Sequence, residues 1–124
     1  MKKSKILFID DEETLASKIK QILEFENFEV QYESSGISAL EYLNNNAPDL
    51  IICDIMMPEM DGFQFYEAFQ KLESKNIPFI FLSANYKLDE FKNRINLETE
   101  DFLSKPISRT DLLKAIEKKL NTVK

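Results

Sequence analysis

Short apolar runs alternate along this chain with stretches of helical periodicity, and this alternation limits the possible folds more than any other feature. Strands are predicted at residues 5–9, around Phe28, Val30 and Tyr32, and at residues 49–54, 78–82 and 101–104. Helices are predicted at residues 13–25 and 38–43, along the apolar stripes Phe63-Tyr66-Phe69-Leu72 and Leu88-Phe91-Ile95, and after Ser108. Strands and helices in alternation form a parallel sheet covered on both sides. The sequence therefore predicts a doubly wound α/β fold.

The last predicted helix has a defined start and a defined buried face. Ser108 and Asp111 have the spacing of a capping box, in which each side chain binds the other residue's backbone N–H. The apolar positions are Leu112, Leu113, Ile116 and Leu120. No repeat or interdomain linker interrupts the pattern, so we expect one domain over residues 1–124.

Composition excludes several classes of protein. The net charge of −6 disfavours non-specific binding to nucleic acid or to an anionic membrane surface. No apolar run approaches the roughly 20 residues of a membrane-spanning helix, and the run 6–9 is too short for a secretory signal. Cys53 is the single cysteine, so no internal disulfide can form and a reducing compartment is indicated. We expect a cytoplasmic protein.

The chain contains no histidine. A histidine-based zinc site, a Ser-His-Asp triad and a self-supplied imidazole nucleophile are therefore excluded.

Polar residues directly follow four of the predicted strands. Asp10 and Asp11 follow the first, Asp54 the third, Ser83 the fourth and Lys105 the fifth. Ligands of open parallel sheets bind outside the carboxyl ends of the strands. We therefore expect these three carboxylates, one hydroxyl and one ammonium group to converge on one edge of the sheet.

Three neighbouring carboxylates repel one another, and a hard divalent cation relieves that repulsion. Mg²⁺ takes oxygen ligands and is commonly held by one or two carboxylates together with a phosphate. Lys105 and Ser83 are suited to the oxygens of a transferring phosphoryl group. Asp54 is then the expected nucleophile, because a carboxylate can accept a phosphoryl group as an aspartyl-phosphate.

Each of these residues, taken singly, has a commoner structural role. Asp11 and Asp61 are candidates for helix N-caps or turns, Ser83 for a cap, and Lys105 for a solvated surface lysine. Cys53 is expected to be a small buried hydrophobic residue. These separate roles do not account for the coincidence of acidic, hydroxyl and basic residues at successive strand ends.

The segments "ILFIDDEE", "PDLIICDIMMPEMDGF", "FLSAN" and "DFLSKP" resemble, in order and over almost the whole chain, the motifs of receiver domains in bacterial two-component response regulators. The resemblance implies a flavodoxin-like sheet with strand order 2-1-3-4-5. It also implies that Asp54 is the phosphoacceptor and that Asp10 and Asp11, together with Asp54, bind Mg²⁺. The backbone carbonyl of Met56 is implied as a further metal ligand.

The same resemblance assigns the remaining roles. Ser83 matches the switch hydroxyl, Lys105 the site lysine and Phe102 the switch aromatic residue. Ala84 matches the small residue that leaves access for phosphate, and the Lys105–Pro106 peptide bond is expected to be cis. The chain departs from the family at residues 97–100, Leu-Glu-Thr-Glu, where many receivers carry Gly-Ala, and Asn85 stands at a variable position that tunes the lifetime of the phosphorylated state.

The implied function is regulatory rather than enzymatic. A phosphohistidine on a sensor histidine kinase or a histidine phosphotransfer protein donates its phosphoryl group to Asp54, and Ser83 and Phe102 then rearrange. The face made by the fourth helix, fifth strand and fifth helix changes shape and signals to a downstream effector domain or protein. Direct contact with nucleic acid or membrane is not expected.

Three alternatives remain open at this point. A phosphatase of the haloacid dehalogenase type would carry Asp-x-Asp after the first strand, where this chain has Asp10-Asp11-Glu12. A degenerate receiver that works without phosphorylation would lack an acidic residue or the lysine. A flavin-binding module would need a phosphate-cradling loop, which is not recognisable here.

Overall fold

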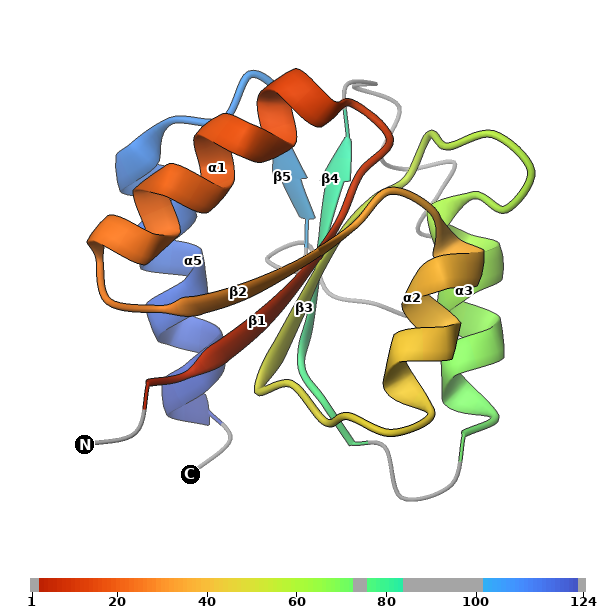
Figure 1. Ribbon diagram of the computed structural model, residues 1–124. Coiled ribbons are helices and arrows are strands. Elements are labelled where there is room, and N and C mark those ends of the chain that lie inside the picture. Colours follow the sequence, from red (N-terminus) through yellow and green to blue (C-terminus); the bar gives the residue numbers. More distant parts are fainter. Residues whose placement is uncertain (1–2, 73–75, 84–101, 123–124) are drawn as a thin grey trace.

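The computed structural model describes residues 3–72, 76–83 and 102–122 (Figure 1). The elements are β1 (Lys5–Ile9), α1 (Glu13–Phe25), β2 (Glu29–Glu33), α2 (Gly36–Leu43), β3 (Leu50–Asp54), α3 (Gly62–Gln70), β4 (Phe79–Ser83), β5 (Phe102–Ser104) and α5 (Arg109–Thr122). The helix expected along residues 88–95, residues 97–100, Ala84 and Asn85 lie outside the described residues. In the described part, no helix is both long enough and apolar enough to cross a bilayer.

The strands form one parallel sheet in the order β2-β1-β3-β4-β5. This confirms the doubly wound fold and its strand order. The order reverses between β1 and β3, which is where an open sheet of this kind leaves a crevice at its carboxyl edge. Asp10 and Asp11 leave the sheet from β1, and Asp54 ends β3.

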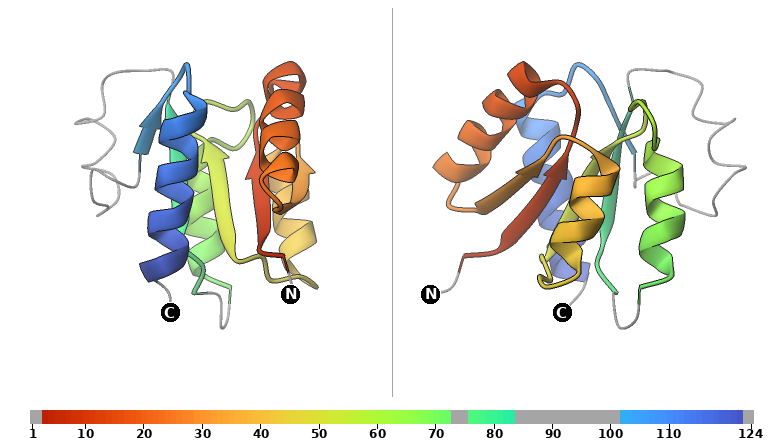
Figure 2. Two further views of the ribbon diagram at one scale, coloured as in Figure 1. Left: turned by 90° about the vertical axis from the view of Figure 1, so that its left-hand side faces the viewer. Right: turned by 45° about the vertical axis from the view of Figure 1, so that its right-hand side comes forward.

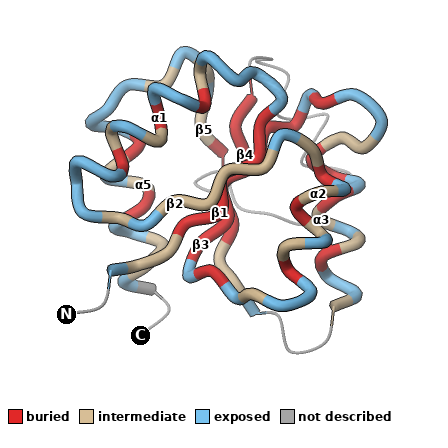
Figure 3. The backbone as a smooth tube through the Cα atoms, viewed as in Figure 1, coloured by how far each residue is buried: buried red, intermediate tan, exposed pale blue. Residues whose placement is uncertain are grey.

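Two layers of helices cover the sheet. Figures 1 and 2 show α1 and α5 on one side and α2 and α3 on the other. Because side chains alternate along a strand, each strand supplies both sides. On the α2–α3 side the strands contribute Leu7, Ile9, Ile51, Cys53, Phe79 and Phe81. On the α1–α5 side they contribute Ile6, Phe8, Leu50, Ile52, Ile80 and Leu82. The strands β3 and β4 are buried along their whole length, as the red interior of Figure 3 shows.

The helix boundaries follow local capping signals. Helix α2 begins at Gly36, two residues before the predicted start, because Ser35 is its N-cap and accepts a hydrogen bond from the Ser38 N–H at 3.1 Å. At the start of α5 the Ser108 hydroxyl accepts a hydrogen bond from the Asp111 N–H at 3.0 Å, which is one of the two bonds of the predicted capping box. Helix α3 buries Phe65 in addition to Phe63 and Phe69.

Helix α1 ends in a Schellman motif that turns the chain back toward β2. Asn27 has the left-handed φ of 72°, which asparagine tolerates better than most residues. The N–H of Asn27 binds the Glu24 carbonyl at 3.0 Å, and the N–H of Phe28 binds the Leu23 carbonyl at 3.0 Å. The turn thereby sets where β2 begins, two residues after Asn27.

Candidate functional site

The carboxyl edge of the sheet is where this fold buries polar side chains. Among the described residues, the buried polar or charged ones are Asp10, Asp54 and Ser83, at 0%, 2% and 1% exposure. Asp10 follows β1, while Asp54 and Ser83 are the last residues of β3 and β4. The topology therefore brings polar side chains from three neighbouring strands to one place.

Asp10, Asp11 and Asp54 form one acidic cluster. Each offers a carboxylate oxygen, and these atoms all lie within 4.8 Å of one another. Burial, reinforced by the charge of Asp10, raises the pKa of Asp54 to about 6. Burial also raises the pKa of Asp10, although the backbone N–H of Glu12 and the ammonium of Lys105 oppose the shift. Among the described residues, the cluster thus holds more negative charge than its neighbours balance.

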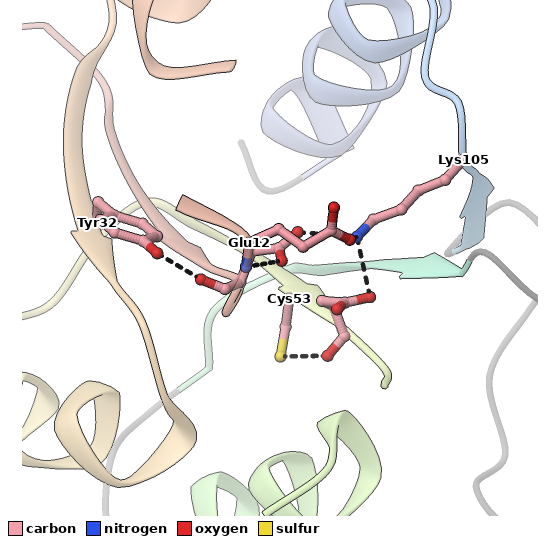
Figure 4. A network of polar contacts seen from close by, with 6 residues as sticks. Glu12, Tyr32, Cys53 and Lys105 are labelled. Atoms are coloured by element: carbon pink, nitrogen blue, oxygen red, sulfur yellow. Dashed lines mark hydrogen bonds and ion pairs between the residues drawn. The ribbon is translucent and has the colours of Figure 1, made fainter. Parts of the chain in front are cut away.

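Lys105 extends across this cluster and contacts three carboxylates. Its Nζ lies 3.0 Å from Asp10 Oδ2, 3.1 Å from Glu12 Oε1 and 3.4 Å from Asp54 Oδ1. Figure 4 shows its side chain reaching toward Glu12. Burial alone would lower the pKa of Lys105, but the hydrogen bond to Asp10 and the nearby carboxylates outweigh it and raise that pKa. Lys105 is therefore held as a cation within the acidic site.

A backbone hydrogen bond fixes the position of the Lys105 main chain. The Lys105 N–H donates to the Ser83 carbonyl at 2.8 Å, which joins the ends of β4 and β5. The Lys105–Pro106 peptide bond is cis.

Glu12 is a member of the site that the sequence analysis did not single out. It is the N-cap residue of α1, and its backbone N–H donates to Asp10 Oδ1 at 2.9 Å. Its own carboxylate binds Lys105. Its acidic character was visible in the sequence, because Glu12 is the third residue of "DDEE". Spacing alone, however, does not show that this side chain turns toward Lys105.

Gly62 permits the chain to pass close behind Asp54. A Cβ at this position would lie 2.6 Å from the Asp54 carbonyl oxygen and 2.8 Å from the Ile55 Cα. Neither backbone atom can move away cheaply, so only glycine fits. Next to it, Asp61 caps α3 in a capping box with Gln64, which gives Asp61 the structural role considered for it.

Tyr32 supports the acidic cluster from the neighbouring strand β2. Its hydroxyl donates a hydrogen bond of 2.6 Å to the backbone carbonyl of Asp10 (Figure 4). Burial and the charges of Glu13 and Asp10 raise the pKa of Tyr32. In the sequence, Tyr32 stands out only as part of an alternating strand pattern.

The other predicted site residues have different environments. Met56 is 58% exposed, whereas Phe102 is buried and its ring stacks on that of Phe81 with centroids 5.5 Å apart. Cys53 is buried, its thiol donates to the Asp54 carbonyl at 3.2 Å, and burial raises its pKa well above the usual value. Cys53 is thus an inert core residue, as its sequence context indicated.

The donor set of this site fits a hard divalent cation. Asp10, Asp11 and Asp54 present carboxylate oxygens, the ligand type that Mg²⁺ prefers. In the described part of the chain, Lys105 is the cation that contacts the buried pair Asp10 and Asp54, and it also contacts Glu12. Asp11 is exposed, so the cluster is open to a metal ion from solvent.

Comparisons with known proteins agree with this arrangement. A family model described as the response regulator receiver domain matches residues 6–117. The response regulator MprA of Mycobacterium sp. (strain KMS) is 30% identical over 111 residues, covering 88% of this chain and 47% of the relative. The response regulator SaeR of Staphylococcus aureus (strain USA300) is 30% identical over 119 residues, covering 96% and 51%. The chain therefore spans about half the length of the curated relatives it matches.

Solved structures give the same result. A response regulator receiver domain protein from Clostridium thermocellum is similar with a TM-score of 0.85 and 31% identity, covering 97% of this chain and 96% of that one. The receiver domain of the Francisella response regulator 1452 has a TM-score of 0.86 and 29% identity, covering 98% and 99%. With this fold and the match over residues 6–117, the chain belongs to the response regulator receiver domain family, whose members act in two-component phosphorelay signalling.

Proposed function

We propose that this chain accepts a phosphoryl group on Asp54 from the phosphohistidine of a partner sensor histidine kinase or histidine phosphotransfer protein. One observation carries the proposal: Asp10, Asp11 and Asp54 gather their carboxylates within 4.8 Å, and Lys105 lies 3.4 Å from Asp54. A buried carboxylate beside metal-binding groups and a lysine is the arrangement that an aspartyl-phosphate requires.

The transfer replaces one bond to phosphorus with another. A carboxylate oxygen of Asp54 forms the new P–O bond, and the P–N bond to the partner's histidine breaks. The imidazole leaves with the electron pair of that bond and takes a proton from solvent. Asp54 must be ionised to attack, and with a pKa of about 6 most of it is ionised at neutral pH.

Asp10, Asp11 and Asp54, with the backbone carbonyl of Met56, are the proposed ligands of Mg²⁺. When bound, Mg²⁺ neutralises charge on the phosphoryl oxygens during transfer. Lys105 is proposed to bind another phosphoryl oxygen, which needs only a small shift from its present contact with Asp54. Ser83, buried at the end of the neighbouring strand β4, is the proposed hydroxyl donor to the phosphorylated product.

The product is proposed to act as a signal rather than as a catalyst. Ser83 moves toward the phosphoryl group, Phe102 shifts with it, and the β5–α5 side of the molecule changes its fit to a downstream effector domain or protein. In this proposal residues 1–124 form one cytoplasmic receiver domain that itself binds neither nucleic acid nor membrane.

Phosphorylation by a small phosphodonor tests the proposal. Acetyl phosphate and Mg²⁺ are expected to add one phosphoryl group to the wild-type chain, observed by intact-mass spectrometry, and EDTA is expected to prevent the addition. Asp54→Asn is expected to remain unmodified. Asp49→Asn is the matched control, because Asp49 precedes the opposite end of the same strand and accepts a hydrogen bond from the Lys5 N–H that asparagine can also accept.

Two results would contradict the proposal. One is Mg²⁺-dependent addition to Asp54→Asn at the wild-type rate. The other is a modification that survives hydroxylamine, which cleaves acyl phosphates. Turnover of p-nitrophenyl phosphate by the wild-type chain would instead favour the phosphatase alternative.

A further inference from the structure

The backbone N–H and the backbone carbonyl of Asp10 both form hydrogen bonds with the end of strand β2. The Asp10 N–H donates to the Glu33 carbonyl at 3.2 Å. The Asp10 carbonyl accepts the hydroxyl proton of Tyr32 at 2.6 Å, the shorter of the two bonds. The first contact continues the sheet ladder, whereas the second comes from a side chain and lies beyond the last paired residue of β1.

The carbonyl of Asp10 belongs to the peptide group that connects Asp10 to Asp11. Because a peptide group is planar, fixing its oxygen also fixes the direction of the Asp11 N–H and the position of the Asp11 Cα. Asp11 is exposed, so core packing does not hold it in place. Two described hydrogen bonds therefore act directly on the turn carrying the Asp11 carboxylate: the one from the Tyr32 hydroxyl to the Asp10 carbonyl, and the one from the Glu12 N–H to Asp10 Oδ1.

Tyr32 is itself part of a rigid element. It pairs with Phe8 in the register of the parallel strands β1 and β2, and the two rings have centroids 6.4 Å apart. The ring packs against the apolar cluster on the α1–α5 side of the sheet. Its hydroxyl is thus presented to Asp10 from a fixed position rather than from a loop.

We propose that Tyr32 is a positioning residue whose hydroxyl holds the Asp10–Asp11 turn in the geometry that binds Mg²⁺. This inference rests on the proposed function, because it concerns the same metal site. Partners behind metal ligands orient those ligands, and their loss typically weakens metal binding by about 10- to 100-fold. Asp54 ends β3 and Lys105 follows β5, so the Tyr32 hydroxyl acts on Asp10 and Asp11 rather than directly on these two residues.

Isothermal titration calorimetry with MgCl₂ tests the proposal on the metal-free chain. Tyr32→Phe keeps the ring and its packing but removes the donor. We expect its dissociation constant for Mg²⁺ to rise about tenfold relative to the wild type. Tyr66→Phe is the matched control, because Tyr66 packs edge-on against Phe79 on the opposite side of the sheet, and its dissociation constant is expected to stay within twofold of the wild type.

A second readout separates positioning from a merely structural role. At saturating Mg²⁺, Tyr32→Phe is expected to reach the wild-type extent of labelling by acetyl phosphate, with its Mg²⁺ requirement moved to about tenfold higher concentration. A lower melting temperature with an unchanged Mg²⁺ dissociation constant would make the hydroxyl a structural contact only and would overturn the inference.

The inference and the proposed function fail in different ways. If the wild-type chain binds no Mg²⁺, the proposed function fails; if it binds Mg²⁺ and Tyr32→Phe binds equally well, only the inference fails. If Tyr32→Phe does not fold, the calorimetric comparison is replaced by NMR of the wild-type chain labelled at the tyrosine ζ-carbon. Mg²⁺ is then expected to shift the Tyr32 resonance more than that of Tyr66, and equal or absent shifts would overturn the inference.

Discussion

The interior of the sheet and its carboxyl edge are built in opposite ways. In the interior, β3 and β4 are buried on both sides among apolar residues, and Phe81 contacts the rings of Phe63, Tyr66, Phe79 and Phe102. At the edge, Asp10 and Asp54 are just as buried, yet they are close enough for each charge to raise the other's energy. The first region stabilises the fold, and the second reduces its stability.

The magnitudes show how the two regions coexist. Full burial of a phenylalanine side chain contributes about 1.5–3 kcal/mol. A pKa of about 6 for Asp54, against a usual 3.8, corresponds to a cost on the order of 3 kcal/mol at neutral pH. One or two buried rings therefore offset the charge that the edge retains for its chemistry. Four substitutions or conditions separate the two regions by their effect on stability.

The largest effect is expected from opening the interior. Phe81→Ala removes a fully buried ring and is expected to lower the free energy of unfolding by about 3–5 kcal/mol, measured by urea denaturation. Phe25→Ala, at a ring that is 79% exposed, serves as control and is expected to cost less than about 1 kcal/mol. Equal losses for the two variants would remove the distinction between interior and surface aromatic residues.

At the edge, neutralising the charge of Asp54 is expected to raise the free energy of unfolding, whereas opening the interior lowers it. The folded-state pKa of Asp54 is raised, so the folded chain binds more protons than the unfolded chain between pH 4 and 6. Protonated Asp54 therefore favours the folded state, and this contribution to the free energy of unfolding is lost as pH rises through about 6. In EDTA, Asp54→Asn is expected to equal the wild type near pH 4 and to be more stable by up to about 3 kcal/mol above pH 7. A variant less stable than wild type at pH 7.5 would contradict this.

Mg²⁺ is expected to stabilise the wild-type chain by binding at the carboxyl edge, but not to stabilise Asp54→Asn. A ligand at 100 times its dissociation constant stabilises the folded state by about 2.7 kcal/mol. Thermal unfolding with MgCl₂ is expected to show this gain for the wild type and little of it for Asp54→Asn. NaCl at equal ionic strength controls for general screening, and NaCl alone reproducing the gain would argue against a specific site.

The smallest effect concerns backbone strain in the loop that follows Asp54. Glu59 has a φ of 67°, a conformation that costs a non-glycine residue about 1–2 kcal/mol. Glu59→Gly relieves that strain but adds chain entropy to the unfolded state, so a net gain of about 0.5 kcal/mol is expected in a thermal melt. Asn27→Gly, at a φ of 72°, is expected to gain less because asparagine tolerates this conformation. A loss of stability in Glu59→Gly would show that the strain at Glu59 is smaller than the chain entropy that glycine adds to the unfolded state.

Most of the fold was predictable from local patterns. The bounds of β1 and α1 match the prediction residue for residue, because a buried apolar run and a helical stripe each leave a clear periodicity. Helix α2 began earlier than predicted because the capping role of Ser35 was overlooked. The order of the strands does not follow from alternation alone; it was implied by the family resemblance.

The candidate site was predictable only in part. Residues that directly follow strands could be placed at one edge, since parallel strands all end on the same side, and the structure brings Asp10, Asp11, Asp54 and Lys105 together there. Glu12 and Tyr32 were missed. Lys105 and Glu12 are 93 positions apart in the chain, and Tyr32 and Asp10 are 22 apart, so no sequence spacing links them.

The sequence by itself determined which segments become strands and helices and which strand ends carry polar groups, because these depend on periodicity and on the neighbouring residues along the chain. Only the tertiary structure decided which polar groups meet. Strand order and register bring Tyr32 to the Asp10 carbonyl and Lys105 to Glu12, and the close approach behind Asp54 demands glycine at position 62. Such contacts depend on the distance between elements. That distance is set between strands by the backbone hydrogen bonds of the sheet, and between a helix and the sheet by side-chain packing.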